Sequence, residues 1–172
     1  MPVIRGQALV SVITAEQRQK VAEQLAKELA GETTQGGPVI FEIPLEQQDR
    51  IDVLVVWEAW KPFSSTDRSN MILAAYKKDP KVQIAQALGV TYSEAVEQQV
   101  LPYAVVPMIR RGELDEEEVK KAMLVQGGFA LENGKVDLRF PTMPLAEQAH
   151  QRLTDALPKG YWSIVHTVGY MQ

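Results

Sequence analysis

The residues best suited to chemistry follow a strongly apolar segment at residues 51–57. They combine aromatic rings, both signs of charge and the start of an expected helix. The set comprises Trp57, Glu58, Trp60, Lys61, Ser64, Asp67, Arg68 and Asn70. Free N–H groups at a helix start hold anions, and a tryptophan with an arginine can stack around a planar ligand. The segment therefore predicts a small-molecule site for a planar or anionic ligand.

The same residues have a structural explanation that needs no ligand, and we prefer it. Trp57 would belong to the core, and Ser64 and Asp67 would cap a helix. Glu58 would pair with Lys61 or Arg68. The two interpretations differ in whether these side chains satisfy one another.

Histidine offers a second possibility, because the chain contains only His150 and His166. His166 lies on an apolar strand face, so we expect partial burial, whereas His150 is expected to face solvent from a helix. A buried imidazole near neutrality could act as a base beside Glu58 or Asp52, although a structural histidine is the simpler interpretation. The acidic run at residues 113–118 fits a helix start better than a calcium loop. We expect no metal site and no cofactor.

The composition of the chain and the absence of known catalytic and cofactor motifs restrict the classes of function that we expect. The net charge of −4 and the pI of about 5.3 argue against nucleic-acid and anionic-membrane surfaces. Phosphate-loop, dinucleotide and nucleophile-elbow patterns are absent, so we lean against an enzyme. Zero cysteines, no apparent signal peptide and no apolar stretch of about 18 residues predict a soluble cytoplasmic protein.

The elements that must position these residues begin with the apolar segment itself. Residues 51–57 are apolar on both faces of an extended strand, and such a strand must be covered on both sides. Side-chain oxygens before apolar periodic runs mark four helix starts, at Thr14, Ser64, Thr91 and Asp115. We expect helices at residues 15–30, 65–78, 82–88, 116–126 and 144–157.

Strands alternate with these helices, at residues 7–13, 39–43, 51–57, 104–109 and 161–168. Pro102 and Pro107 favour an edge position, or a broken helix, for residues 104–109. Asn133-Gly134 predicts a type I′ hairpin turn between strands starting near Phe129 and Val136.

The resulting order is β-α-β-β-α followed by β-α-β-β-α-β. The second string is that of a ferredoxin-like split βαβ unit. We therefore predict an α+β fold of two ferredoxin-like modules with antiparallel sheets, at residues 1–79 and 102–172. A helical connector at 80–101 would join them. In such a unit the helices cover one sheet face and leave the other open.

The connector contains Leu88-Gly89-Val90-Thr91 between two expected helices. Locally, residues 82–96 resemble a bacterial helix-turn-helix. The second helix has glutamates and no lysine or arginine, so we expect a plain connector and no nucleic-acid partner.

The leading functional hypothesis is a non-enzymatic protein that works through an apolar sheet face. It would self-associate, as a homo-oligomer, or bind another protein, because the strands expose more apolar surface than the helices can cover. The alternative is the small-molecule site near Trp60, Arg68 and Ser64. The third possibility is acid–base catalysis by His166.

Overall fold

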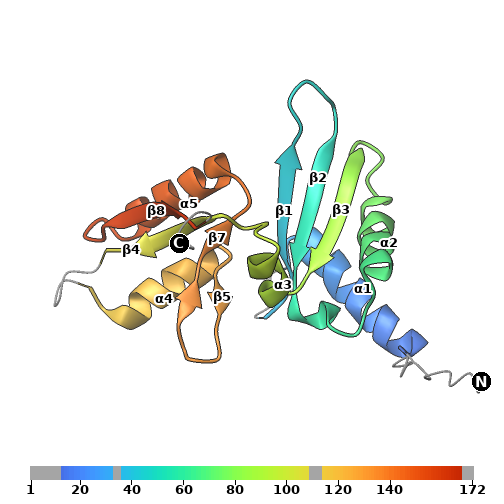
Figure 1. Ribbon diagram of the computed structural model, residues 1–172, viewed down its shortest axis with the longest axis horizontal. Helices are drawn as coiled ribbons and strands as arrows, with labels where there is room; N and C mark the ends of the chain where they lie inside the picture. Colours follow the sequence, from blue (N-terminus) through green and yellow to red (C-terminus); the bar gives the residue numbers. More distant parts are fainter. Residues whose placement is uncertain (1–12, 33–35, 109–113, 168–172) are drawn as a thin grey trace, which may run out of the picture. The chain divides into compact units, whose positions relative to one another are not determined.

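The computed structural model describes residues 13–32, 36–108 and 114–167. The protein is an α+β protein that divides into two compact units, Met1–Thr91 and Tyr92–Gln172 (Figure 1). Each unit combines helices with a small sheet. The strand expected at residues 7–13 lies, except for Ile13, outside the described residues.

The first unit is built on one three-stranded sheet with the order β1-β2-β3 (Figure 1). Its elements are α1 (Ala15–Leu29), β1 (Val39–Pro44), β2 (Ile51–Val56), the 3-10 turn η1 (Glu58–Trp60), α2 (Ser65–Tyr76) and β3 (Ile84–Val90). The expected antiparallel pairing of β1 with β2 is confirmed. β3 instead runs parallel to β2, with α2 as the crossover, so the sheet is mixed rather than purely antiparallel.

Strand β2 is the centre of this unit, as its sequence predicted. Val53 and Val55 are 1% and 0% exposed, and Leu54 and Val56 on the opposite face are 5% and 1% exposed. The first face packs in a cluster with Val21 and Leu25 of α1 and with Ile72 and Tyr76 of α2. Water is therefore excluded from both faces of β2 over residues 53–56.

The helix expected at residues 82–88 is wrong. Ile84–Val90 is strand β3, and it pairs with the edge of β2. Alanine, glutamine and leucine favour a helix intrinsically, but pairing with a buried strand overrides a weak local propensity. The first half of the apparent helix-turn-helix is thus a strand, and only α3 (Tyr92–Glu97) of the expected connector is helical.

The second unit contains a three-stranded antiparallel sheet with the order β7-β4-β8 and a hairpin of β5 and β6. Its remaining elements, in chain order after α3, are β4 (Tyr103–Pro107), α4 (Glu116–Val125), β5 (Phe129–Ala130), β6 (Val136–Asp137), β7 (Arg139–Phe140), α5 (Met143–Ala156) and β8 (Trp162–His166). β6 leads through Leu138 into β7, and the Val105 N–H donates to the Leu138 carbonyl at 2.9 Å.

Two local predictions for this unit are wrong. β4 is the middle strand rather than an edge, because Pro107 comes last in the strand and Pro102 precedes it. The hairpin turn is not type I′, which requires two successive positive φ angles. Gly134 has φ +75°, whereas Asn133 does not, and its side chain instead accepts from the Lys135 N–H at 3.0 Å.

Helix starts are set largely by local chemistry. Thr14 and Gln17 form the expected reciprocal capping box of α1. Ser64 Oγ accepts from the Asp67 N–H at 3.2 Å, and Asp115 accepts from the Glu117 N–H at 3.1 Å. These bonds satisfy N–H groups that a helix cannot satisfy internally, so the sequence alone locates the starts of these three helices.

Candidate functional site

The aromatic residues of the predicted ligand site belong to the core of the first unit. Trp57 and Trp60 are 5% and 0% exposed, and their rings pack edge to face with centroids 5.5 Å apart. Phe63 extends the stack at 6.1 Å from Trp60. The Trp60 indole N–H donates to the Val55 carbonyl at 3.2 Å, so its polar group is satisfied within the unit.

Arg68 is also buried, with 6% of its surface exposed. Its Nε donates to the Phe63 carbonyl at 2.9 Å and its Nη1 to the Gly89 carbonyl at 3.2 Å. Trp60 and Arg68 do lie together, because a Cβ at Gly89 would fall 3.2 Å from the Trp60 ring and 2.8 Å from Arg68 Cβ. They pack over the backbone of Gly89, a residue whose role the sequence analysis missed.

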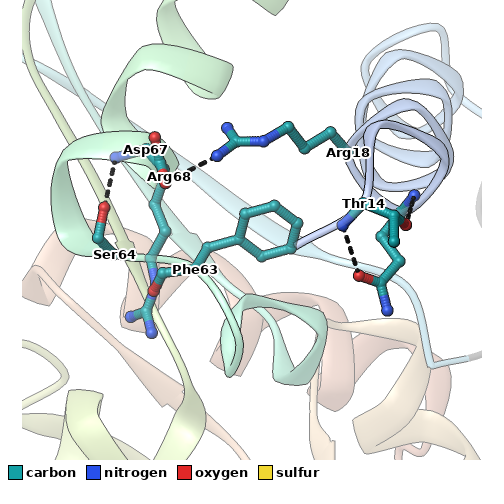
Figure 2. A network of polar contacts seen from close by, with 7 residues as sticks. Thr14, Arg18, Phe63, Ser64, Asp67 and Arg68 are labelled. Carbon is teal, nitrogen blue, oxygen red and sulfur yellow. Dashed lines mark hydrogen bonds and ion pairs between the residues drawn. The ribbon is translucent and has the colours of Figure 1, made fainter. Parts of the chain in front are cut away.

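A polar network links the starts of α1 and α2 (Figure 2). Arg18 pairs with Asp67 at 3.2 Å, and its guanidinium lies 6.0 Å from the centre of the Phe63 ring. The hydrogen bond from Arg18 holds the pKa of Asp67 below its usual value. Arg18 was not among the predicted site residues, because nothing in the sequence brings residue 18 to residue 67.

The remaining predicted residues of the first unit face solvent. Glu58 pairs with Lys61 at 3.1 Å, and their side chains are 58% and 73% exposed. Asn70 is exposed on α2, and Ser64 serves as the helix cap. The intramolecular contacts of the set match its structural explanation, while its ligand-binding role stays a prediction.

The two histidines belong to the second unit and differ from expectation. His166 is exposed rather than partly buried, because it ends the edge strand β8, and its ring packs against Tyr103 at 5.0 Å. His150 is half-buried, and its Nε2 hydrogen-bonds with the Trp162 carbonyl at 2.9 Å. Glu58 and Asp52, the expected carboxylate partners of His166, lie in the first unit.

Within the second unit, the two faces of the β7-β4-β8 sheet differ sharply. Opposite residues of paired strands share a face. One face carries four buried side chains, with exposed fractions of 0% for Leu138, 6% for Phe140, 1% for Val105 and 8% for Trp162. This is the face that α5 covers, since α5 contacts all three strands and the opposite face keeps large side chains exposed.

We call the opposite face of this sheet the outer face. The pairings Ala104 with Val165 and Val106 with Ser163 place these residues on it, and the Met108 N–H donates to the Tyr161 carbonyl at 2.6 Å, which continues the same register. Its residues are Ala104, Val106, Met108, Tyr161, Ser163 and Val165. Four of these side chains are exposed, by 39% for Val106, 58% for Met108, 61% for Tyr161 and 39% for Val165.

These four side chains form an apolar stripe along β4 and β8. Nine large hydrophobic residues are exposed among the described residues, and four of them lie in this stripe. Isolated exposed apolar residues are normal, whereas a contiguous group on one face marks a contact surface. The sequence predicts strands for these residues, but it does not predict which sheet face the helices leave open.

A polar cluster borders the stripe beside β7. Arg139 Nε donates to Asp137 Oδ2 at 2.7 Å, and the Tyr92 hydroxyl donates to the same carboxylate oxygen. Thr167 Oγ1 donates to the Pro102 carbonyl at 3.0 Å and lies 3.5 Å from Arg139 Nη1. The cluster holds α3 and the end of β8 to the sheet, and its groups satisfy one another.

Three further observations bear on function. Among the described residues, no group of three or more acidic or histidine side chains is placed to hold a metal ion. No helix in that part of the chain is both long enough and apolar enough to cross a bilayer. The chain matches no protein-family model, no curated protein and no solved structure.

Proposed function

We propose that this protein is a non-enzymatic, cytoplasmic protein-binding domain that acts through the outer face of its second unit. The contact is either with another copy of the chain or with a different protein. The observation that carries the proposal is the apolar stripe of Val106, Met108, Tyr161 and Val165 on the sheet face opposite α5.

The size of the stripe supports a contact surface. The exposed fractions of the four side chains leave an apolar area on the order of 400 Å², similar to the largest patch of an ordinary monomer and often functional. Exposed apolar area is favourable to bury, at roughly 25 cal/mol per Å². A partner that covered the stripe would therefore gain binding energy from burial alone.

We also propose that the second unit is a ferredoxin-like split βαβ module. Three features support this topology: the order of the elements, the β8-β4-β7 pairing, and the continuation of β7 through β6 into the hairpin with β5. Such a module places both helices on one sheet face. The proposal therefore explains why the outer face is open.

The small-molecule alternative has less support. Trp60 and Arg68 lie together, as that alternative requires, but their N–H groups donate to backbone carbonyls of the same unit. A ligand between them would have to replace contacts that already satisfy these donors. Catalysis by His166 also has less support, because its side chain is exposed rather than buried in an apolar environment.

Site-specific alkylation tests the proposed contact. The chain has no cysteine, so Val106→Cys and Val96→Cys each carry a single thiol. Val96 on α3 is a matched control, because it is a valine with 37% exposure against 39% for Val106. We expect the thiol at position 106, but not at 96, to react several-fold more slowly with a maleimide inside cells than in dilute purified protein.

Lysine substitutions provide an independent readout. Val106→Lys should abolish the protection of a thiol at position 165, whereas Val96→Lys should leave it unchanged. Equal alkylation rates at positions 106 and 96 under every condition would show that nothing covers the outer face, and the proposal would be abandoned.

A further inference from the structure

The turn of the β5–β6 hairpin contains an Asn133-Gly134 pair that the proposed function does not use. Residues 132–135 are all exposed, so water has free access to this turn. The chain contains two asparagines, and the other one, Asn70, lies within α2. Asparagine is a thermolabile residue, because its side-chain carboxamide can react with the main chain. The two asparagines differ in how well the fold places them for this reaction.

The backbone nitrogen of Gly134 is the group that can attack the Asn133 carboxamide and close a five-membered ring. A Cβ at Gly134 would meet nothing within 4 Å, so the turn leaves open space beside this nitrogen. The Gly134 N–H donates to the Leu131 carbonyl at 3.0 Å, and this bond must break before the nitrogen attacks. A neutral hydrogen bond of this kind slows the attack by no more than about tenfold.

The Asn133 side chain is held in place as the electrophile. Its Oδ1 accepts from the Lys135 N–H at 3.0 Å, a bond that reaches across Gly134 and holds the carboxamide beside the following backbone. Attack at Cγ places negative charge on Oδ1, and a backbone N–H at this distance stabilises such a charge. Asn70 is placed differently, because the nitrogen that would attack it belongs to Met71 in the interior of α2 and is engaged in the helix.

We propose that Asn133-Gly134 is a self-modification site, at which the side chain cyclises with the main chain and loses ammonia. The Gly134 nitrogen gives up its proton and bonds to Asn133 Cγ, the Cγ–Nδ2 bond breaks, and the departing amino group takes up a proton. Water then opens the cyclic imide, giving aspartate by attack at Cγ or isoaspartate by attack at the main-chain carbonyl carbon. Either product adds one negative charge to the net charge of −4. This inference goes beyond the proposed function and does not depend on it.

The two products affect the hairpin differently. Aspartate keeps a side-chain oxygen that can accept from the Lys135 N–H, whereas isoaspartate inserts an additional carbon into the main chain of the turn. The hairpin also contacts α3, since the Phe129 ring lies 4.8 Å from the Tyr92 ring and Asp137 accepts from the Tyr92 hydroxyl. Isoaspartate formation therefore loosens a hairpin that holds α3 in the second unit.

Incubation of the folded protein in mildly alkaline buffer, followed by tryptic digestion and mass spectrometry, tests the proposal. Trypsin separates the two asparagines into peptides 122–135 and 69–77, so both are measured in one sample, and an unincubated sample is the blank. We expect Asn133 to deamidate at least about tenfold faster than Asn70, because reaction at Asn70 requires α2 to open. The same incubation in guanidinium chloride gives the rate of the unfolded chain, and the folded rate at Asn133 should lie within about tenfold of it.

Gly134→Ala is the matched variant, because its methyl group crowds the attacking nitrogen. It should deamidate several-fold more slowly than the unmodified chain, in guanidinium chloride as well as in buffer. Equal rates in guanidinium chloride, where folding plays no part, would exclude attack by the Gly134 nitrogen and overturn the proposal. An Asn133 that keeps its amide in the folded protein while the unfolded chain converts would overturn it too, because the hairpin would then protect the site.

Thermal melts test the effect on the hairpin. Asn133→Asp carries the charge of the product without the additional main-chain carbon, so it should melt close to the fresh protein. The isoaspartate fraction, separated by ion exchange after incubation, should melt at a lower temperature. An isoaspartate fraction that melts like Asn133→Asp would overturn the proposed loosening of the hairpin.

Discussion

Gly89 offers the sharpest test of how the first unit is held together. A Cβ at this position would lie 2.8 Å from Arg68 Cβ and 3.2 Å from both Cε2 and Nε1 of Trp60. Ordinary carbon contacts lie at about 3.5–4.0 Å, so Gly89→Ala must push α2 or the indole away by roughly half an ångström or more. Neither neighbour yields easily, because one atom is fixed to a helix backbone and the other to a fully buried ring.

Overpacking of this kind costs about 1–3 kcal/mol, a large share of the stability of a typical domain. We therefore expect Gly89→Ala to lower the free energy of unfolding of the first unit by that amount. Urea titration followed by tryptophan fluorescence measures it. The background should carry Trp162→Phe, so that only Trp57 and Trp60 of the first unit report.

The control is Ala85→Ser, an exposed position on the same strand, where a change within about 0.5 kcal/mol is expected. If Gly89→Ala were as stable as that control, the close packing of Trp60 and Arg68 over Gly89 would be refuted. The structural explanation of the predicted ligand residues would then lose its main support.

Three further outcomes are expected. Tyr76→Phe removes the 2.7 Å hydrogen bond to Glu42 and should cost about 0.5–1.5 kcal/mol in urea titrations. Burial, and after it the bond to Glu42, raises the pKa of Tyr76 in the folded protein. The contribution of the Tyr76 hydroxyl to the free energy of unfolding is therefore complete below about pH 10 and declines as the pH rises further. The difference in the free energy of unfolding between the unmodified protein and Tyr76→Phe should shrink over the same range. The pKa of Asp67 is lowered by Arg18, so the thermal-stability advantage over Asp67→Asn should be present at pH 7, begin to decline below about pH 4 and be lost as the pH falls through the lowered pKa. An unchanged advantage at pH 3 would exclude this ion pair as its source. Gly134→Ala, at φ +75°, should destabilise the second unit by about 1–2 kcal/mol, and Gly134→Asn by less, in thermal melts of each variant.

Local chemistry explains which predictions succeeded. The starts of α1, α2 and α4 follow from Thr14, Ser64 and Asp115, whose side chains bond to N–H groups within the same helical turn. The pairing of β1 with β2 follows from two alternating segments joined by a short loop. These interactions span only a few residues, so a single sequence contains all the information they require.

Nonlocal packing explains the failures. The residues of β3 favour a helix by themselves, but they form a strand because they pair in parallel with one edge of β2. Gly89 matters because residues 60 and 68 converge on it, and Arg18 matters because α1 contacts α2. The exposure of His166 depends on the position of β8 in the sheet order. None of these relationships has a signature in the spacing of neighbouring residues.

The sequence by itself determined the α+β composition, most helix starts and the burial of β2, since these follow from periodicity, capping side chains and apolar content. Only the tertiary structure decided that Trp60 and Arg68 each donate a hydrogen bond to a backbone carbonyl of their own unit. It also decided that one open sheet face carries Val106, Met108, Tyr161 and Val165. The physical reason is that strand order and register choose which of two alternating faces a helix covers. That choice is made by residues far apart along the chain.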